Sequence, residues 1–323
     1  DAPAAPIVLD GDLALQTACV RLVEANISSA PVRDTAADRL VGMLDFRDIA
    51  TYIVAELSRS SEHLNDHDLD VAKLVATART APASSGVVTV KQVMNFSGRD
   101  PLVAVSATAP LVTALRHFVE QRVQRLCVVD GAVTDAAAAA AQPLVGVFSQ
   151  STLIALIASE FGHMPRLNKL TAANASWPTG DQTLEQLGLA HGDVISVTSD
   201  HSVLDALRAM LDHGISSIAI VGKTEAERHR LVGSLSMSDV KHILAKKGGL
   251  RCLFENAFAF FARIRYQQGV ESGADRVPSF TVKATTTLIA AIERLAATRV
   301  HRLWVEKDGR LTGVLSLSDI LPL

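Results

Sequence analysis

The sequence predicts an α+β protein built from four copies of one strand-helix-strand-strand-helix unit. Three observations support this fold class. A nine-residue motif that reads as a strand turning directly into a helix occurs four times. An amphipathic helix precedes each motif, and a β-rich run separates that helix from the motif. Internal repetition of this kind is the sequence signature of a repeat architecture.

The motif has one position that differs between the copies. The copies are GMLDFRDIA from Gly42, GVFSQSTLI from Gly146, GSLSMSDVK from Gly233 and GVLSLSDIL from Gly313. In three of them an aspartate lies six residues after the glycine, and these aspartates are Asp48, Asp239 and Asp319. The copy from Gly146 has Thr152 at this position.

The helix before each motif is amphipathic. In the third copy, SVLDALRAMLDHG, apolar residues follow helical spacing and Gly214 is a stop signal. The apolar positions are Val203, Leu204, Leu207, Met210 and Leu211. The other copies read LALQTACVRLVEAN, PLVTALRHFVEQR and TLIAAIERLAATR, so each unit has the same helix.

The β-rich run after this helix alternates between odd and even copies. The first and third carry Ser28-Ser29 and Ser216-Ser217, whereas the second and fourth carry Gln124-Arg125 and His301-Arg302. The repeats therefore form two unlike pairs. A single repeat is too small to bury much apolar surface, so we expect each pair to pack face to face.

This pairing predicts two domains. Residues 1–165 would hold repeats at about 7–58 and 94–160, and residues 166–323 would hold repeats at about 193–246 and 279–323.

Three segments outside the repeat pattern have local signals. DGAVTDAAAAAAQP, residues 130–143, occupies the turn between two strands and reads as an insertion at a hairpin tip. In TLEQLGL, Thr183 and Gln186 have capping-box spacing, which predicts a short helix before the third repeat. LFENAFAFFARIRYQQ predicts a helix before the fourth repeat, with phenylalanines that face the core or a partner.

Composition excludes several classes of protein. The chain has 323 residues and a net charge of −3 without a basic run, which argues against nucleic acid as the main partner. No uncharged apolar stretch approaches the roughly 18 residues that span a bilayer, and no signal peptide is visible. Cys19, Cys127 and Cys252 are far apart and odd in number, as expected for reduced core residues. We expect a cytoplasmic or nuclear protein with no membrane partner.

Motifs for catalysis or metal binding are incomplete. GKT at residues 222–224 suggests a P-loop, but the required earlier glycine position is Ser217. His63 and His67 lie among aspartates, yet no distant ligand set completes a metal site, and a solvated acidic linker is the better interpretation. No nucleophile elbow is present. The sequence therefore predicts no enzyme activity and no covalent cofactor.

The S-x-S-D pattern at the strand-to-helix junction has two interpretations. Serine is a favoured N-cap, and an aspartate in the first turn complements the helix dipole, so capping alone explains every copy. The same geometry suits an anionic or polyhydroxyl ligand, because exposed amides bind anions and a carboxylate accepts hydrogen bonds from a ribose diol. The residues alone leave both interpretations open.

These repeats resemble cystathionine-β-synthase (CBS) domains, which pair into Bateman modules. Four of them together resemble the γ regulatory subunit of AMP-activated or SNF1-related protein kinase, and the similarity covers nearly the whole chain. It is most specific at VHRLWVEKDGRLTGVLSLSDIL, residues 300–321, and TLEQLGLAHGDVISV resembles the approach to that family's third repeat. The resemblance implies two Bateman modules in a disc-like arrangement.

In that family adenine nucleotides lie between paired repeats, and the aspartate binds ribose. The resemblance therefore implies that Asp48, Asp239 and Asp319 bind ribose hydroxyls, while Thr152 marks a degenerate site. It implies further nucleotide-binding residues, which are Ser316, Ser318, His301, Arg302, Arg125, Thr198 and Ser199. His301 and Arg302 match the family's phosphate-facing pair.

The chain also departs from the family. Gln124 replaces a histidine, Ser28-Ser29 offers no arginine in the first repeat, and FSQST lacks the basic residues of the second motif. These departures make the Asp48 site the weakest candidate for phosphate.

The resemblance implies a non-catalytic regulatory subunit that binds AMP, ADP or ATP and signals occupancy to a protein partner, a kinase. The alternative is a structural CBS-repeat subunit of a larger assembly with empty or permanently filled sites. An enzyme that depends on adenosine phosphates ranks third. Basic residues that converge on the site distinguish a sensor from a scaffold.

Overall fold

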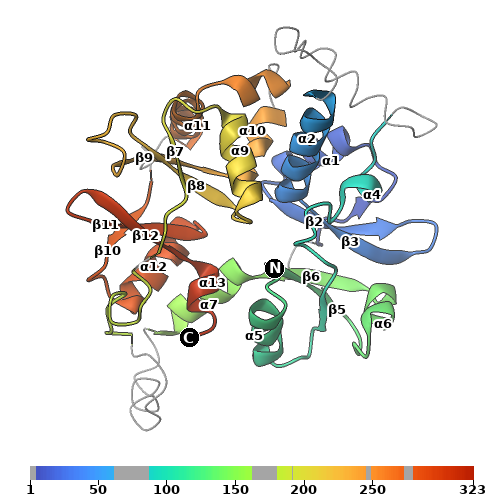
Figure 1. Cartoon of the computed structure of the whole chain (residues 1–323). Coiled ribbons are helices and arrows are strands. Elements are labelled where there is room, and N and C mark those ends of the chain that lie inside the picture. Colours follow the sequence, from blue (N-terminus) through green and yellow to red (C-terminus); the bar gives the residue numbers. More distant parts are fainter. Residues whose placement is uncertain (1–4, 62–86, 162–179, 191, 245–248, 273–278) are drawn as a thin grey trace.

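The computed structural model describes residues 5–61, 87–161, 180–190, 192–244, 249–272 and 279–323. Four three-stranded sheets with their helices lie around a common centre (Figure 1). The predicted α+β fold of four strand-helix-strand-strand-helix repeats is confirmed.

Each repeat contributes one sheet and the helices that flank it. Repeat 1 contains β1 (Leu9–Asp10), α1 (Leu15–Glu24), β2 (Ser29–Asp34), β3 (Arg39–Asp45) and α2 (Phe46–Ser61). Repeat 2 contains β4 (Ala104–Ser106), α5 (Leu111–Glu120), β5 (Arg125–Val129), β6 (Leu144–Ser149) and α7 (Gln150–Phe161), with α6 (Ala136–Ala141) in the predicted insertion.

Repeat 3 contains β7 (Ser196–Thr198), α9 (Val203–Asp212), β8 (Ser217–Val221), β9 (Leu231–Ser236), the 3-10 helix η1 (Met237–Asp239) and α10 (Val240–Leu244). Repeat 4 contains β10 (Thr281–Lys283), α12 (Leu288–Thr298), β11 (Arg302–Lys307), β12 (Arg310–Ser316) and α13 (Leu317–Ile320). Between repeats lie α4 (Val90–Val93), η2 (Gly249–Phe254) and α11 (Ala257–Ser272).

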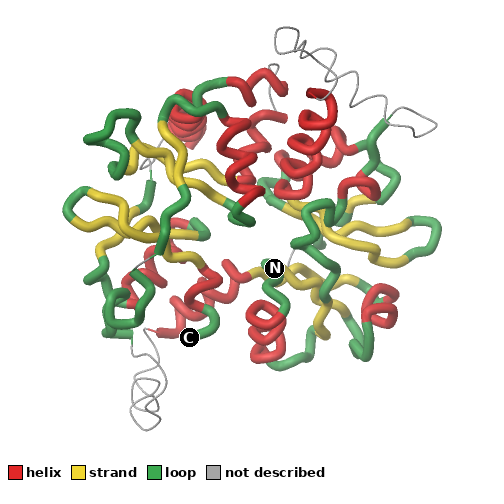
Figure 2. The backbone as a smooth tube through the Cα atoms, viewed as in Figure 1, coloured by secondary structure: helices red, strands yellow, loops and turns green. Residues whose placement is uncertain are grey.

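All four sheets have one topology. The first strand pairs parallel with the second, and the second pairs antiparallel with the third. Each antiparallel pair has a register shift at the same place, for example between Val32 and Arg33 in repeat 1 and between Val305 and Glu306 in repeat 4. Such a bulge bends the strand locally and is a built feature of the unit. The alternation of strand and helix around the centre is visible in Figure 2.

Within each half of the chain the two sheets meet through the alternating residues of the sequence. In the first half, Arg125 of repeat 2 donates to the Ser28 hydroxyl of repeat 1 at 2.6 Å. In the second half, Arg302 of repeat 4 donates to the Ser216 hydroxyl of repeat 3 at 2.5 Å and to the Ser217 carbonyl at 3.1 Å. The arginine of each even repeat thus donates to the serine pair of the odd repeat beside it.

The apolar cores run across this pairing. One core joins repeats 1 and 3 and includes Phe46 and Phe260, while a second joins repeats 2 and 4 and includes Phe118 and Leu315. A smaller cluster joins repeats 1 and 2, where the Cys127 thiol donates to the Met43 sulfur at 3.7 Å. The division into domains 1–165 and 166–323 remains a prediction, but each half shares its largest cores with the other half.

Other sequence predictions concern single residues. Cys19, Cys127 and Cys252 are unpaired and buried, as predicted. Thr183 and Gln186 form the two capping-box hydrogen bonds, although the segment is a turn and not a helix. His63 and His67 lie outside the described residues. No helix among the described residues is long and apolar enough to cross a membrane.

The shared cores make the four repeats one cooperative unit. Phe46→Ala removes a fully buried ring from the core between repeats 1 and 3, so we expect a loss of about 3–5 kcal/mol in the free energy of unfolding. Calorimetry should show a single transition at a lower temperature. Two transitions, of which only one moves, would contradict a shared core; Tyr266→Ala, on a side chain that is 78% exposed, is the control.

Candidate functional site

In three copies of the motif the aspartate accepts a hydrogen bond at the start of its helix, and in the second copy Ser149 is the acceptor instead. The backbone N–H of Asp45 donates to Asp48 at 3.1 Å, that of Ser236 to Asp239 at 2.8 Å and that of Ser316 to Asp319 at 2.7 Å. In the second copy the hydroxyls of Thr152 and Ser149 lie 2.8 Å apart, and the Thr152 N–H donates to Ser149. The capping interpretation of the sequence is therefore realised in all four repeats.

Capping engages only one oxygen of the Asp239 and Asp319 carboxylates among the described residues. Both hydrogen bonds of Asp319 end on Oδ2, and the hydrogen bond of Asp239 also ends on Oδ2. Within the described part of the chain, Oδ1 of each carboxylate has no hydrogen-bond partner. A cap and a ligand contact can thus coexist on one aspartate.

Asp48 differs, because its Oδ1 also accepts hydrogen bonds from the protein. The backbone N–H and the hydroxyl of Ser97 donate to Asp48 Oδ1 at 3.0 and 2.6 Å, and the side chain is fully buried. Burial raises the pKa of this carboxyl, although the hydrogen bonds from Ser97 and Asp45 oppose that rise. Asp48 has no oxygen left for a ribose in this structure.

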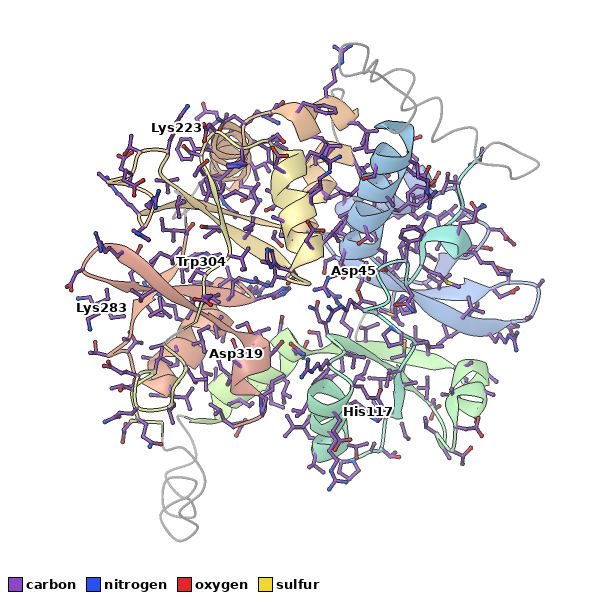
Figure 3. All side chains as sticks on the ribbon, viewed as in Figure 1. Asp45, His117, Lys223, Lys283, Trp304 and Asp319 are labelled. Atoms are coloured by element: carbon purple, nitrogen blue, oxygen red, sulfur yellow. The ribbon has the colours of Figure 1, made fainter. Side chains whose placement is uncertain are left out.

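Asp45 and Arg47 give the first repeat charges that its sister motifs lack. They occupy the two serine positions of the S-x-S-D pattern, since the first copy reads D-F-R-D. Asp45 forms an ion pair with Arg125 at 2.5 Å, and its own helix capping uses the other oxygen, which accepts from the Arg47 N–H at 2.7 Å. Figure 3 shows Asp45 and Asp319 close to the middle of the molecule, whereas Lys223 and Lys283 lie on its outside.

His301 lies among cations from two other repeat motifs. The His301 side chain keeps accessible surface, but protein surrounds it, and the charges of Arg125, Arg302 and Arg47 add to that desolvation. These effects lower the pKa of His301 to about 4, so the ring is neutral at pH 7. A bound anion would reverse this effect, because a nearby negative charge favours the imidazolium.

Arg302 is held in place by repeat 3 and repelled by repeat 1. Burial and the positive charge of Arg47 lower its pKa to about 10, against the opposing negative charge of Asp319. Its two terminal nitrogens donate to Ser217 and Ser216, but its buried Nε has no partner. The guanidinium therefore has an unused donor.

The sequence prediction did not include Arg47, because in the other repeats the basic residue lies at the position that Ser28-Ser29 occupies in repeat 1. The relevant signal was the replacement of the second motif serine by arginine. Among the described residues, the Arg47 guanidinium has no hydrogen bond or ion pair, yet its charge acts on His301, Arg302 and Asp100. We name Arg47, Arg125, His301 and Arg302 the central cationic cluster.

Asp100 is a second residue that the sequence did not indicate. It is 5% exposed, and its Oδ2 is buried without a partner. Burial and the negative charges of Asp45 and Asp48 raise its pKa to about 7, against the opposing charges of Arg125 and Arg47. Near neutral pH this carboxyl is partly protonated beside the central cationic cluster.

The remaining predicted residues have local partners. The Thr198 hydroxyl bonds to Asp200 and His201, each at 2.6 Å, and the Ser199 carbonyl accepts from the Phe258 N–H at 3.4 Å. Ser316 forms the cap of α13 with Asp319, and Ser318 is exposed beside it. The structure thus brings Arg125, His301, Arg302 and Asp319 into one electrostatic group and leaves Thr198 and Ser199 outside it.

The repeated unit matches a known family. The CBS domain model matches residues 4–55, 90–159, 188–246 and 275–323. The chain belongs to the CBS-domain family.

Relatives with CBS domains occur in fungi. The chain is 28% identical to protein sds23 of Neosartorya fischeri over 297 residues, which cover 91% of this chain and 50% of that protein. It is 30% identical to protein sds23 of Aspergillus niger over 268 residues, or 82% of this chain and 47% of that protein. The chain therefore spans about half the length of these curated relatives.

A solved structure has the same overall arrangement. Protein MJ1225 of Methanocaldococcus jannaschii, presented as a candidate archaeal homologue of g-AMPK, superposes with a TM-score of 0.65 at 15% identity. The superposition covers 99% of this chain and 96% of that one. At this identity the likeness shows the fold, and it confirms the predicted arrangement of four CBS repeats.

The raised pKa of Asp100 makes stability depend on pH. The folded protein keeps this proton up to about pH 7, while the unfolded chain releases it near pH 4, so the free energy of unfolding falls as pH rises between these values. Asp100→Asn removes this loss, and we expect it to raise the free energy of unfolding at pH 8 by about 2–4 kcal/mol.

Denaturant unfolding at pH 4 and pH 8 tests this expectation. The variant and the parent should differ little at pH 4. Asp12→Asn, on an exposed loop, is the control, and an equal pH dependence in parent and Asp100→Asn protein would contradict the assignment.

Proposed function

We propose that this CBS-domain chain is a non-catalytic regulatory protein that binds AMP, ADP or ATP at its centre. One observation carries the proposal. Arg47, Arg125 and Arg302 come from three different repeats and act electrostatically with His301 at one place, where burial and then the neighbouring positive charges lower the pKa of His301 and of Arg302. Cations held together at such a cost are the expected setting for an anionic ligand.

The second support is the carboxylate next to this cluster. Asp319 acts electrostatically on Arg302 and keeps Oδ1 free, so a ligand with a diol and a phosphate could contact both. A ribose phosphate has these two groups. Arginine meets phosphate with a rigid fork of donors, and the unpartnered Nε of Arg302 is one such donor.

The first motif is best assigned a different role. Because Asp48 is fully buried and both its oxygens accept hydrogen bonds from Ser97 or Asp45, we assign this carboxylate to structure and not to ribose binding. Repeat 1 would serve the ligand through Arg47 instead. Asp239 has no partner on Oδ1 among the described residues and would bind a second ribose more weakly, because repeat 3 carries Ser216-Ser217 where repeat 4 carries His301-Arg302.

Occupancy would be reported to a protein partner, which we propose to be a protein kinase. The ligand would contact repeats 1, 2 and 4 at once, and the shared cores couple each of these repeats to another. A change at the centre would thereby reach outer surfaces. The competing proposal is a scaffold with permanently capped motifs, which the complete capping of all four copies favours.

Asp319→Ala separates the two proposals. Loss of a charge-assisted hydrogen bond costs about 1.5–3 kcal/mol, so calorimetric affinity for AMP, ADP or ATP should fall by roughly ten- to a hundredfold. Thr152→Ala is the matched control and should leave affinity unchanged. If the parent binds no adenine nucleotide, or Asp319→Ala loses only stability, the scaffold proposal stands.

Arg47→Ala tests the contribution of the first repeat. We expect affinity for AMP to fall about tenfold and affinity for adenosine to stay the same, because the guanidinium contacts only phosphate. Thermal stability should not fall, since the change relieves repulsion of Arg302 and His301. Arg47→Lys should restore part of the affinity; equal losses for AMP and adenosine would refute a phosphate contact.

A further inference from the structure

Three carboxylates gather at the contact between repeats 1 and 2. Asp45 is the last residue of β3, Asp48 lies in the first turn of α2, and Asp100 lies between α4 and β4. The negative charges of Asp45 and Asp48 both act on Asp100. Like charges this close to one another disfavour the ionised form of at least one of the three groups.

Hydrogen bonds hold Asp100 at this place. Its backbone N–H donates to the Asn95 side-chain oxygen at 3.0 Å, and the Asn95 N–H donates to the Met43 carbonyl of β3 at 3.2 Å. Between these two residues, Ser97 donates to Asp48 with its N–H and its hydroxyl. The segment of residues 95–100 is therefore fastened to the first motif, and Asp100 is fixed beside it.

The three carboxylates differ in the donors that they receive. One oxygen of Asp45 accepts from Arg125 at 2.5 Å and the other from the Arg47 N–H at 2.7 Å. Both oxygens of Asp48 also accept hydrogen bonds. Asp100 is 5% exposed, and its buried Oδ2 has no donor among the described residues. A charge on this oxygen would be costly, whereas a protonated carboxyl carries no charge into the interior.

The cations that act on Asp100 belong to the central cationic cluster. They are Arg125 of β5 and Arg47 of α2, and both favour the ionised form of Asp100. The adjacent Arg99 has its guanidinium at repeat 3, since a Cβ on Gly214 would lie 2.6 Å from its terminal nitrogen. The charge state of Asp100 therefore bears on two arginines that are candidates for a phosphate contact.

We propose, on the basis of the nucleotide site proposed above, that Asp100 is a proton switch, which takes up a proton when a phosphate ligand binds at the central cationic cluster. An ionised Asp100 offsets part of the positive charge of Arg47 and Arg125 and repels a phosphate, whereas a protonated Asp100 does neither. By linkage the effect is reciprocal, so a bound phosphate strengthens the hold of Asp100 on its proton.

The switch operates near neutral pH. Burial and the charges of Asp45 and Asp48 raise the pKa of Asp100 to about 7 in the protein without ligand. A phosphate nearby raises this pKa further, so affinity for the phosphate ligand is highest when Asp100 is protonated and falls as pH rises through 7. A pKa that differs by about one between free and bound protein corresponds to an about tenfold change in affinity.

Asp100→Asn tests the switch, because asparagine has nearly the shape of the protonated carboxyl and does not titrate. By calorimetry at pH 8, we expect the variant to bind AMP about three- to tenfold more tightly than the parent, and at pH 6 the two should agree within about twofold. The second ionisation of the AMP phosphate, near pH 6, affects both proteins equally. Adenosine should show no difference between them, and Asp12→Asn, on an exposed loop, should behave as the parent.

Proton uptake can also be measured directly. Calorimetry of AMP binding at pH 7 in buffers of different ionisation enthalpy gives the number of protons bound with the ligand. We expect the parent to take up about 0.3–0.5 proton more per AMP than Asp100→Asn does. His301 is present in both proteins, so any proton that it takes up cancels in this difference.

Two results would overturn the proton switch alone. The first is the same pH dependence of AMP affinity in the parent and in Asp100→Asn. The second is an equal change of AMP affinity in the variant at pH 6 and pH 8, which would make Asp100 a structural residue of the site. A parent that binds no AMP at either pH would overturn the proposed function, and the switch with it.

Discussion

The contact between an arginine of an even repeat and a serine pair of an odd repeat organises this protein. The side chain of Arg125 donates to Ser28 of repeat 1, and the side chain of Arg302 donates to Ser216 of repeat 3. These bonds fix which sheets meet, and they place both guanidiniums at the centre. The first pair of sheets also shares the small apolar cluster, and in the second pair the Leu311 N–H donates to the His229 carbonyl.

The centre of the molecule therefore holds several basic side chains whose positive charges repel one another. The charge of Arg47 acts on Arg302, and His301 stays neutral because burial and the cations around it oppose its protonation. Asp45 and the partly protonated Asp100 balance part of this charge on the side of repeats 1 and 2. On the other side the negative charge of Asp319 acts on Arg302, so a carboxylate and a guanidinium lie together there.

The same structural unit therefore serves different purposes in different copies. The motif aspartate caps a helix in three repeats, but only Asp239 and Asp319 keep an oxygen for a ligand, because Ser97 occupies the second oxygen of Asp48. Departures from the repeat rule thus change which groups each copy leaves without a partner inside the described part of the protein.

By itself the sequence determined the repeat unit, its topology and the pairing of sheets. The linear chain contains the repeated motif, the apolar spacing of the helices and the alternation of serine pairs with arginines. Once one unit is interpreted as α+β, its repetition predicts the same unit three more times. Only the tertiary structure decided that Ser97 donates to Asp48, that the charge of Arg47 acts on Arg302 and that the cores extend across both halves of the chain. These outcomes depend on distances between residues far apart in the chain, and neither local propensity nor spacing encodes such distances.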